Sequence, residues 1–101
     1  MNRVFKALSD PTRRRVLQLL RERPMTAGEL ADHFPLSKGA MSAHFNVLRE
    51  ADLIGADKQG ASITYRLQVS VLEDALLAFA DSFGLGFTIT APSAKPTEED
   101  A

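Results

Sequence analysis

Apolar positions recur at helical spacing within the segment 26–51, in two runs that a proline separates. Thr26 precedes the first run and has Glu29 three residues on, which is the spacing of a capping box at a helix start. Pro35 stops this helix, because proline lacks the backbone N–H that a helix interior needs. The pattern predicts a short helix whose apolar face is Leu30, Ala31 and Phe34.

The second run predicts a longer helix with two different faces. Ser37 is a suitable N-cap residue, and apolar residues then recur every three or four positions, at Ala40, Met41, Phe45, Leu48 and Ala51. At about 100° per residue, the inner face collects Met41, His44, Phe45 and Leu48. The outer face collects Lys38, Gly39, Ser42, Ala43, Asn46 and Arg49.

The outer face has the chemistry of a helix that reads DNA. Its residues are small near the N-terminus of the helix, and its Ser and Asn side chains donate and accept hydrogen bonds. Within this helix, no acidic residue precedes Glu50. Small side chains let a helix sit deep in the major groove, and basic ones suit guanine or phosphate. Taken alone, the pattern is equally compatible with a polar surface that has no partner.

A two-turn helix is predicted at the start of the chain, over Asn2 to Ala7 or Leu8. Its apolar spacing comes from Val4, Phe5 and Leu8. A helix this short persists only if its apolar face packs on another surface.

The next helix is predicted to begin at Asp10 and Pro11, an N-cap aspartate followed by proline at the first helical position, and to run to about Glu22. Arg13 falls on the stripe of this helix that faces the core. A buried arginine must be paired, so Arg13 is expected to meet a carboxylate or a carbonyl within the chain, or else to reach a phosphate. The intramolecular pair is the favoured alternative. The apolar members of the stripe are Val16, Leu17 and Leu20.

A β-hairpin is predicted after the two helices of the segment 26–51. Residues 53 to 57 can extend as one strand, residues 58 to 61 form a turn that contains Gly60, and apolar and polar residues then alternate from Ser62 to Leu67. Lys58 and Gln59 are placed at the tip, within reach of a phosphate or the minor groove. A merely solvated turn is an equally good interpretation of the tip.

A last helix is predicted from about Val71 to Phe83, opened by a second capping box at Ser70 and Glu73. It is apolar beyond one stripe, which favours burial against a second subunit over packing in one small core. The alternative is a monomer whose C-terminus folds back over this helix. The stripe itself consists of Leu72, Ala75, Leu76, Phe79 and Phe83.

These elements predict one mainly α domain over residues 1–87, a winged helix-turn-helix with the wing at 53–68 and a dimerisation helix at 70–84. Residues 88–101 have the Pro, Ser and acidic content of a disordered tail. Residues 1–68 carry a net charge of +4 and residues 69–101 a net charge of −5, which fits a DNA-facing surface and a separate pairing or tail region.

The composition of the chain bears on its cellular location and on its class of function. The 101 residues include no cysteine, which excludes disulfides and thiolate metal sites, and no leader or membrane-spanning run is evident. A cytoplasmic protein without membrane insertion is expected. With two histidines and no clustered nucleophile, base and acid, an enzyme is not expected, and no cofactor is predicted.

The chain also resembles the ArsR-type bacterial repressors, over about residues 2 to 83. The resemblance rests on FKALSDPTRRRVLQLL at 5–20, MTAGELADHF at 25–34, LSKGAMSAHFNVLREADLI at 36–54, and TYRL at 64–67. VFKA, SDPTRR, MTAG and VLED make it most similar to the SdpR-type autorepressors.

The resemblance implies a homodimer, paired through the first and last helices, that places two recognition helices in successive major grooves of a palindromic operator. The implied interface residues are Val4, Phe5, Leu8, Leu72, Leu76, Phe79 and Phe83. The implied recognition positions are Ser37, Lys38, Ser42, Ala43 and His44, although the helix count places His44 nearer the core, as a packing or phosphate contact. Release is implied through a small ligand or a sequestering protein partner.

Departures from the family pattern bear on the signal and the operator. The family's metal sensors carry Cys-x-Cys where this chain has Thr26 to Gly28, and His33 and His44 lie in different helices, so transition-metal sensing is not expected. An oxygen-ligand site for a hard cation at Glu73, Asp74 or Asp81 stays open. Ala43 and Ala61 stand where larger polar or basic residues are common in the family, which weakens the expected DNA contacts.

A second function is compatible with the same fold, namely a protein-interaction module that does not bind DNA. The outer face of the second helix discriminates the two, because a protein-binding version needs exposed apolar residues where this chain has Lys38, Ser42, Asn46 and Arg49.

Overall fold

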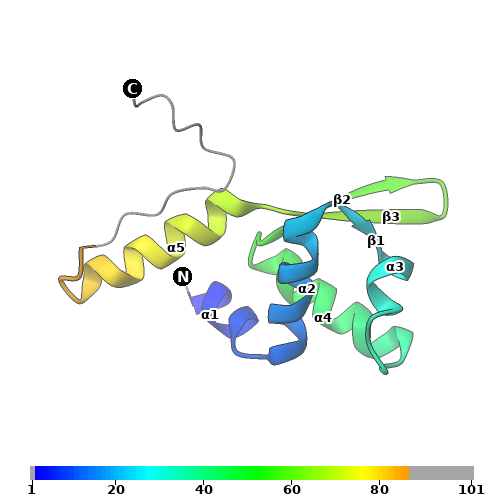
Figure 1. Cartoon of the computed structure of the whole chain (residues 1–101), viewed down its shortest axis with the longest axis horizontal. Coiled ribbons are helices and arrows are strands. Elements are labelled where there is room, and N and C mark those ends of the chain that lie inside the picture. Colours follow the sequence, from blue (N-terminus) through cyan, green and yellow to red (C-terminus); the bar gives the residue numbers. More distant parts are fainter. Residues whose placement is uncertain (1, 87–101) are drawn as a thin grey trace.

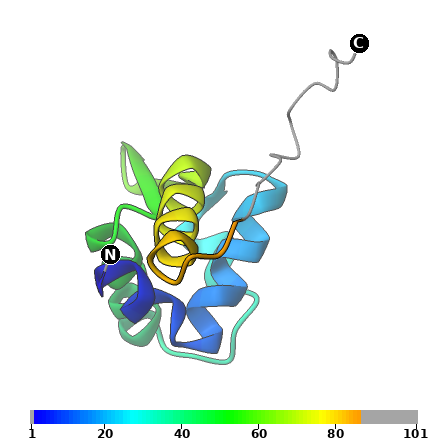
Figure 2. The ribbon, with the colours of Figure 1, turned by 90° about the vertical axis from the view of Figure 1, so that its left-hand side faces the viewer.

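The computed structural model describes residues 2–86, and the predicted tail at 88–101 lies outside the described residues. Helices α1 to α4 form a compact body with a small sheet beside it, while α5 extends away from the body and runs past α1 (Figures 1 and 2). The predicted mainly helical fold with a β-hairpin is confirmed. In chain order the elements are α1 (Asn2–Leu8), α2 (Pro11–Glu22), β1 (Met25–Thr26), α3 (Ala27–Ala31), α4 (Lys38–Glu50), β2 (Ile54–Gln59), β3 (Ser62–Leu67) and α5 (Val69–Ser82).

The sheet has three antiparallel strands in the order β1-β3-β2. The sequence did not predict β1, because two residues are too few to show an alternating pattern. The placement of Lys58 and Gln59 in the turn was wrong: both belong to β2, where they pair with Ile63 and Ser62. The turn is a two-residue loop that starts at Gly60, whose positive φ of 59° suits glycine.

The core lies between the helices and the sheet. Val16 of α2, Leu30 of α3 and Leu48 of α4 have no exposed surface. The ring of Phe45 on α4 packs against that of Tyr65 on β3 with centroids 4.7 Å apart. Burial raises the pKa of the Tyr65 hydroxyl, an effect that the charge of Arg49 only partly offsets. The predicted inner faces of α2 and α4 are therefore confirmed as core faces, apart from Arg13 and His44, which are half-buried.

Side chains cap the helices of the helix-turn-helix as predicted. The Glu29 N–H donates to Thr26 Oγ1 at 3.0 Å and the Thr26 N–H donates to Glu29 Oε1 at 2.8 Å, which completes the capping box. The hydrogen bonds from Thr26 and Arg23 lower the pKa of Glu29. Helix α3 is shorter than predicted and ends at Ala31, so Phe34 packs on the core from the turn instead.

The predicted second capping box, at Ser70 and Glu73, is wrong. Helix α5 begins at Val69, and Gln68 stands at the N-cap position without a side-chain cap. The Gln68 N–H donates to the Leu53 carbonyl at 2.9 Å, so Gln68 is held by the segment before β2 and the helix starts directly after it. A hydrogen bond to a distant segment therefore decides where α5 starts.

Two helices end in the same hydrogen-bonded motif with different residues at the left-handed position. After α4, Asp52 has φ 59°, its N–H donates to the Arg49 carbonyl, and the Leu53 N–H donates to the Leu48 carbonyl. After α5, Gly84 takes the equivalent place with φ 72°. This is the Schellman motif, in which glycine is the favoured residue because a Cβ is strained at positive φ.

Replacing Asp52 with glycine should therefore stabilise the fold. Asp52→Gly relieves the strain at φ 59° and should raise the free energy of unfolding by about 0.5–1 kcal/mol, measured by urea denaturation. Asp32→Gly is the matched control, because Asp32 ends α3 with φ −63° and glycine there only loosens the unfolded chain. A loss of stability in Asp52→Gly equal to that in Asp32→Gly would contradict the prediction.

Asp10 should make a pH-dependent contribution to stability. Partial desolvation raises the pKa of its carboxyl, but the hydrogen bond from the Arg13 N–H and the nearby His44 and Arg13 outweigh it, so the net shift is downward. A lowered pKa means that the contribution is complete above the unfolded value of about 3.9 and is lost as the pH falls through the folded value.

Asp10→Ala should cost about 1 kcal/mol at neutral pH because α2 loses its N-cap. Asp10→Asn should keep most of the cap at neutral pH and lack the acid-dependent component. Urea unfolding of the three proteins from pH 7 to pH 3 measures both effects. An Asp10→Ala protein that loses stability with the same acid profile as the original chain would refute the assignment.

Candidate nucleic-acid interface

Helix α4 is fixed by its inner face and free on its outer face. Met41, Phe45 and Leu48 are 1%, 3% and 0% exposed, so the core sets both the position and the rotation of the helix. The six residues of the predicted outer face are all exposed: Lys38, Gly39, Ser42, Ala43, Asn46 and Arg49. A polar face is thus presented to solvent on a helix that cannot rotate without opening the core.

The start of α4 combines a capped helix end with hydrogen-bonding side chains. The Ala40 N–H donates to Ser37 Oγ at 3.1 Å, so Ser37 serves first as the cap and keeps only its hydroxyl proton for a ligand. Leu36, just before the cap, and Met41, at the fourth helical position, have the spacing of a hydrophobic staple. Lys38 and Ser42 follow one turn apart on the exposed side.

A hollow of about 240 Å³ separates α3 from the first half of α4. Small residues of α3 leave this space open, and Met41 and Phe45 contribute its apolar part. Its lining is Ala27, Gly28, Ala31, Lys38, Met41, Ser42 and Phe45.

The wing presents one paired and one unpaired cation. Arg66 Nη1 lies 2.6 Å from Asp57 Oδ2. The Arg66 guanidinium also lies over Gly55, and a Cβ at position 55 would be only 2.7 Å from this group. Gly55 therefore makes room for this ion pair. Lys58 and Gln59 are exposed on β2, and Lys58 forms no salt bridge to any residue that the structure describes.

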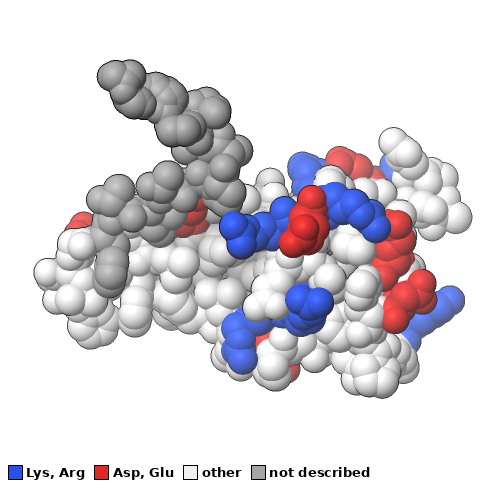
Figure 3. All heavy atoms as spheres, viewed as in Figure 1, with Lys and Arg blue, Asp and Glu red and all other residues white. Residues whose placement is uncertain are grey.

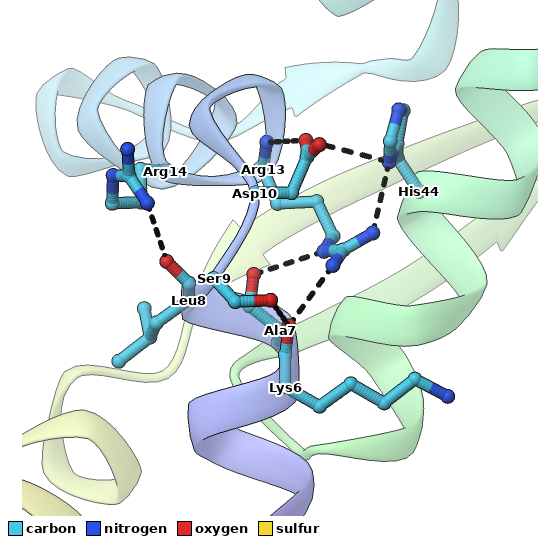
Figure 4. Close-up of polar contacts among 8 residues, drawn as sticks. All are labelled: Lys6, Ala7, Leu8, Ser9, Asp10, Arg13, Arg14 and His44. Atoms are coloured by element: carbon cyan, nitrogen blue, oxygen red, sulfur yellow. Dashed lines mark hydrogen bonds and ion pairs between the residues drawn. The ribbon is translucent and has the colours of Figure 1, made fainter.

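Arg13 connects three helices through a single guanidinium group (Figure 4). Its Nε donates to the Ala7 carbonyl and its Nη2 to the Lys6 carbonyl, both at 2.9 Å, while Nη1 lies 3.2 Å from His44 Nδ1. The predicted intramolecular partners of Arg13 are confirmed as carbonyls at the end of α1. Sequence reasoning missed His44 as a partner, since helical periodicity does not relate α2 to α4.

His44 consequently lies apart from the other predicted DNA contacts. Its Nδ1 faces the start of α2, where Asp10 Oδ2 is 3.8 Å away, and its side chain is 20% exposed. This position agrees with the helix count, which places His44 nearer the core than the outer face of α4. Arg14 supports the same junction, because its Nη1 donates to the Leu8 carbonyl at 2.7 Å.

The residues predicted to pair two subunits fall into two groups. Val4 is buried in the core of its own chain, and Leu8 and Leu72 are half-buried against that core. Leu76 and Phe79 on α5 are 39% and 43% exposed, and Phe83, which directly follows the helix, is 66% exposed. The rings of Phe5 and Phe79 lie 4.8 Å apart, so α1 covers part of the α5 face.

On the face seen in Figure 3, few charged side chains are visible over the described part of α5, whereas basic and acidic side chains are both visible over the body of the molecule. Within residues 2–86, no three His, Cys, Asp or Glu side chains come close enough together to hold a metal ion. In the same part of the chain, no helix has the length and the apolar content needed to span a bilayer.

Comparisons with known proteins agree with this geometry. A family model described as a helix-turn-helix domain matches residues 8–54. The transcriptional repressor SdpR of Bacillus subtilis is 49% identical over 76 residues, which cover 75% of this chain and 84% of that protein. The regulator NmtR of Mycobacterium tuberculosis is 33% identical over 93 residues, covering 89% of this chain and 78% of the relative.

A solved structure shares the arrangement of the elements as well. The crystal structure of an ArsR family transcriptional regulator superposes with a TM-score of 0.76 at 31% identity, over 82% of this chain and 91% of that one. The sequence match and the shared fold both extend beyond the helix-turn-helix to most of the chain. This protein belongs to the ArsR family of helix-turn-helix transcriptional regulators.

Proposed function

We propose that the protein is a dimeric repressor that binds a palindromic operator through the outer faces of its two α4 helices. The observation that carries the proposal is the exposed, acid-free outer face of a helix whose opposite face is locked into the core. Ser42 and Asn46 suit base edges, and Lys38 and Arg49 suit guanine or phosphate. Gly39 and Ala43 keep the helix slim enough to enter the groove.

The wing supports the same mode of binding. Lys58 and Gln59 are exposed on the outer strand of the hairpin, and we propose that they contact the DNA backbone or the adjacent minor groove. Arg66 is neutralised by Asp57, so Lys58 supplies the charge at this end of the interface.

Dimerisation is proposed through α1 and α5. An arm that exposes Leu76, Phe79 and Phe83 is costly in water, and a second copy of the same arm would bury these side chains. Two α4 helices could then meet half-sites about 34–36 Å apart, one turn of DNA. Val4 belongs to the protomer core and acts in this interface only by holding α1 in place.

The setting is proposed to be the cytoplasm, with repression lifted by a small ligand or by a protein partner that sequesters the dimer. The protein-interaction module without DNA binding is not favoured. Among the described residues, the large exposed apolar side chains lie on α5, at Phe83 and Leu85 just after it, and at Leu36 rather than on the outer face of α4.

DNA binding is tested most simply by fluorescence anisotropy on the duplex upstream of the protein's own gene, against a scrambled duplex, at several salt concentrations. The proposal predicts selective binding, at least about 10³-fold tighter to one sequence, that weakens steeply with salt. If both duplexes bind weakly, selection from a library of genome fragments follows. Failure of that selection to enrich any sequence would refute the proposed function.

The outer face of α4 is tested by removing its two cations. Lys38→Ala combined with Arg49→Ala should cost about 1–3 kcal/mol of binding free energy for each side chain that bonds a base edge. The slope of log affinity against log salt should become shallower by about 0.9 for each side chain that neutralises a phosphate. Arg15→Ala combined with Arg21→Ala is the matched control, since it removes the same charge from exposed positions on α2. Equal effects of the two pairs would mean that α4 is not the reading helix.

The pairing surface is tested on α5. Phe83→Glu, alone and with Phe79→Glu, should shift the protein from dimer to monomer in sedimentation, because a carboxylate cannot be buried unpaired against a second subunit. Ala78→Glu is the control, since Ala78 is exposed and lies about 100° around the helix from Phe79. Circular dichroism monitors the fold. A folded Phe83→Glu protein that remains as dimeric as Ala78→Glu would place the interface elsewhere.

A further inference from the structure

We propose that Arg13 is a positioning residue for DNA binding: it holds His44 in the tautomer protonated on Nε2, and this N–H donates to a DNA phosphate beside α4. The inference rests on the DNA-binding function proposed above. It assigns a role to the cluster of Asp10, Arg13 and His44, which lies outside the outer face of α4. It concerns the flank of the recognition helix that faces α1 and α2 (Figure 4).

The guanidinium of Arg13 determines which ring nitrogen of His44 can carry the proton. Arginine has five N–H donors and no acceptor, so the 3.2 Å contact between Nη1 and His44 Nδ1 is a hydrogen bond only if Nδ1 accepts. In a neutral imidazole the proton then sits on Nε2. The two bonds to the carbonyls of Lys6 and Ala7 fix the plane of the guanidinium, so that Nη1 is aimed at the ring.

Asp10 is the group that could favour the other tautomer of His44, because a carboxylate beside Nδ1 favours a proton on Nδ1. Its Oδ2 lies 3.8 Å from Nδ1, beyond hydrogen-bonding distance, and already accepts the Arg13 N–H at 3.1 Å. The closer contact, from Arg13, therefore decides the tautomer. Lys6 contributes its carbonyl to the cluster, and its side chain points away from the ring in Figure 4.

The second ring nitrogen is the free one. Figure 4 shows Nε2 turned away from Arg13 and Asp10, and no hydrogen bond joins it to any residue in 2–86. At about 100° per residue, His44 lies on one flank of α4, and Lys38 and Arg49 lie on the other. A helix in the major groove has a sugar-phosphate strand along each flank, so a donor at this place meets phosphate rather than a base edge.

The tautomer can be measured without DNA. Nitrogen-15 NMR of the full chain, at an alkaline pH where the rings are neutral, distinguishes a protonated ring nitrogen from an unprotonated one. His33→Gln assigns the signals, because the chain has two histidines. We expect His44 to show a single tautomer with the proton on Nε2. A proton on Nδ1, or a mixture of the two forms, would overturn the proposal.

Substitutions test whether Arg13 sets this state. Arg13→Gln should give His44 a mixture of tautomers, whereas Arg14→Gln should leave the tautomer as it is. Arg14 is the matched control, since it has the same charge, is adjacent in sequence and holds a carbonyl at the end of α1 without touching His44. An unchanged tautomer in Arg13→Gln would mean that Arg13 does not position the ring.

The consequence for DNA is read on a duplex that the unaltered protein selects from a random library. Arg13→Gln and His44→Gln should each lower the affinity by about tenfold, and the double variant should bind no more weakly than either single one. Independent, additive effects would overturn the role of Arg13 as acting through His44. If the unaltered protein selects no duplex, the proposed DNA function fails and the phosphate contact fails with it, while the tautomer measurement still decides the Arg13–His44 interaction.

Discussion

The burial of one face of α4 is the constraint on which the rest of the structure depends. Met41, Phe45 and Leu48 supply the centre of a small core, and the sheet, α2 and α3 close around them. A helix packed in this way loses stability if it rotates by even one residue, because each apolar side chain would exchange a core site for water. The outer face is therefore free to be selected for its chemistry alone.

Polar interactions then set the boundaries around this packed helix. Ser37 starts α4, the capping box of Thr26 and Glu29 starts α3, and Asp52 ends α4 in a conformation that favours glycine. Arg13 ties the end of α1 to both α2 and α4. The element that extends furthest from the body is thus connected to the recognition helix through α1, by ring contacts at Phe5 and hydrogen bonds at Arg13.

Local patterns predicted most of the helices, because the caps and apolar stripes lie within each helix's own sequence. They placed Asp10, Thr26 and Ser37 at helix starts and Met41, Phe45 and Leu48 in the core. They failed where a distant segment decides. Strand β1 exists because β3 pairs with it, and α5 starts at Val69 because Gln68 is still bonded to Leu53. The same limit hid the contact between Arg13 and His44, whose positions in sequence are far apart. Periodicity predicts which residues of α4 are exposed, but it does not identify the molecule that they contact.

The most direct test of the central claim uses the absence of cysteine from the chain. A DNA-cleaving iron chelate attached to Asn46→Cys would report where the outer face of α4 lies on a selected duplex, with the chelate on Ala78→Cys as the control on α5. The account predicts two clusters of cuts about 10 base pairs apart, in successive major grooves, from the α4 probe alone. Cuts of equal strength from both probes, or none from α4, would contradict it.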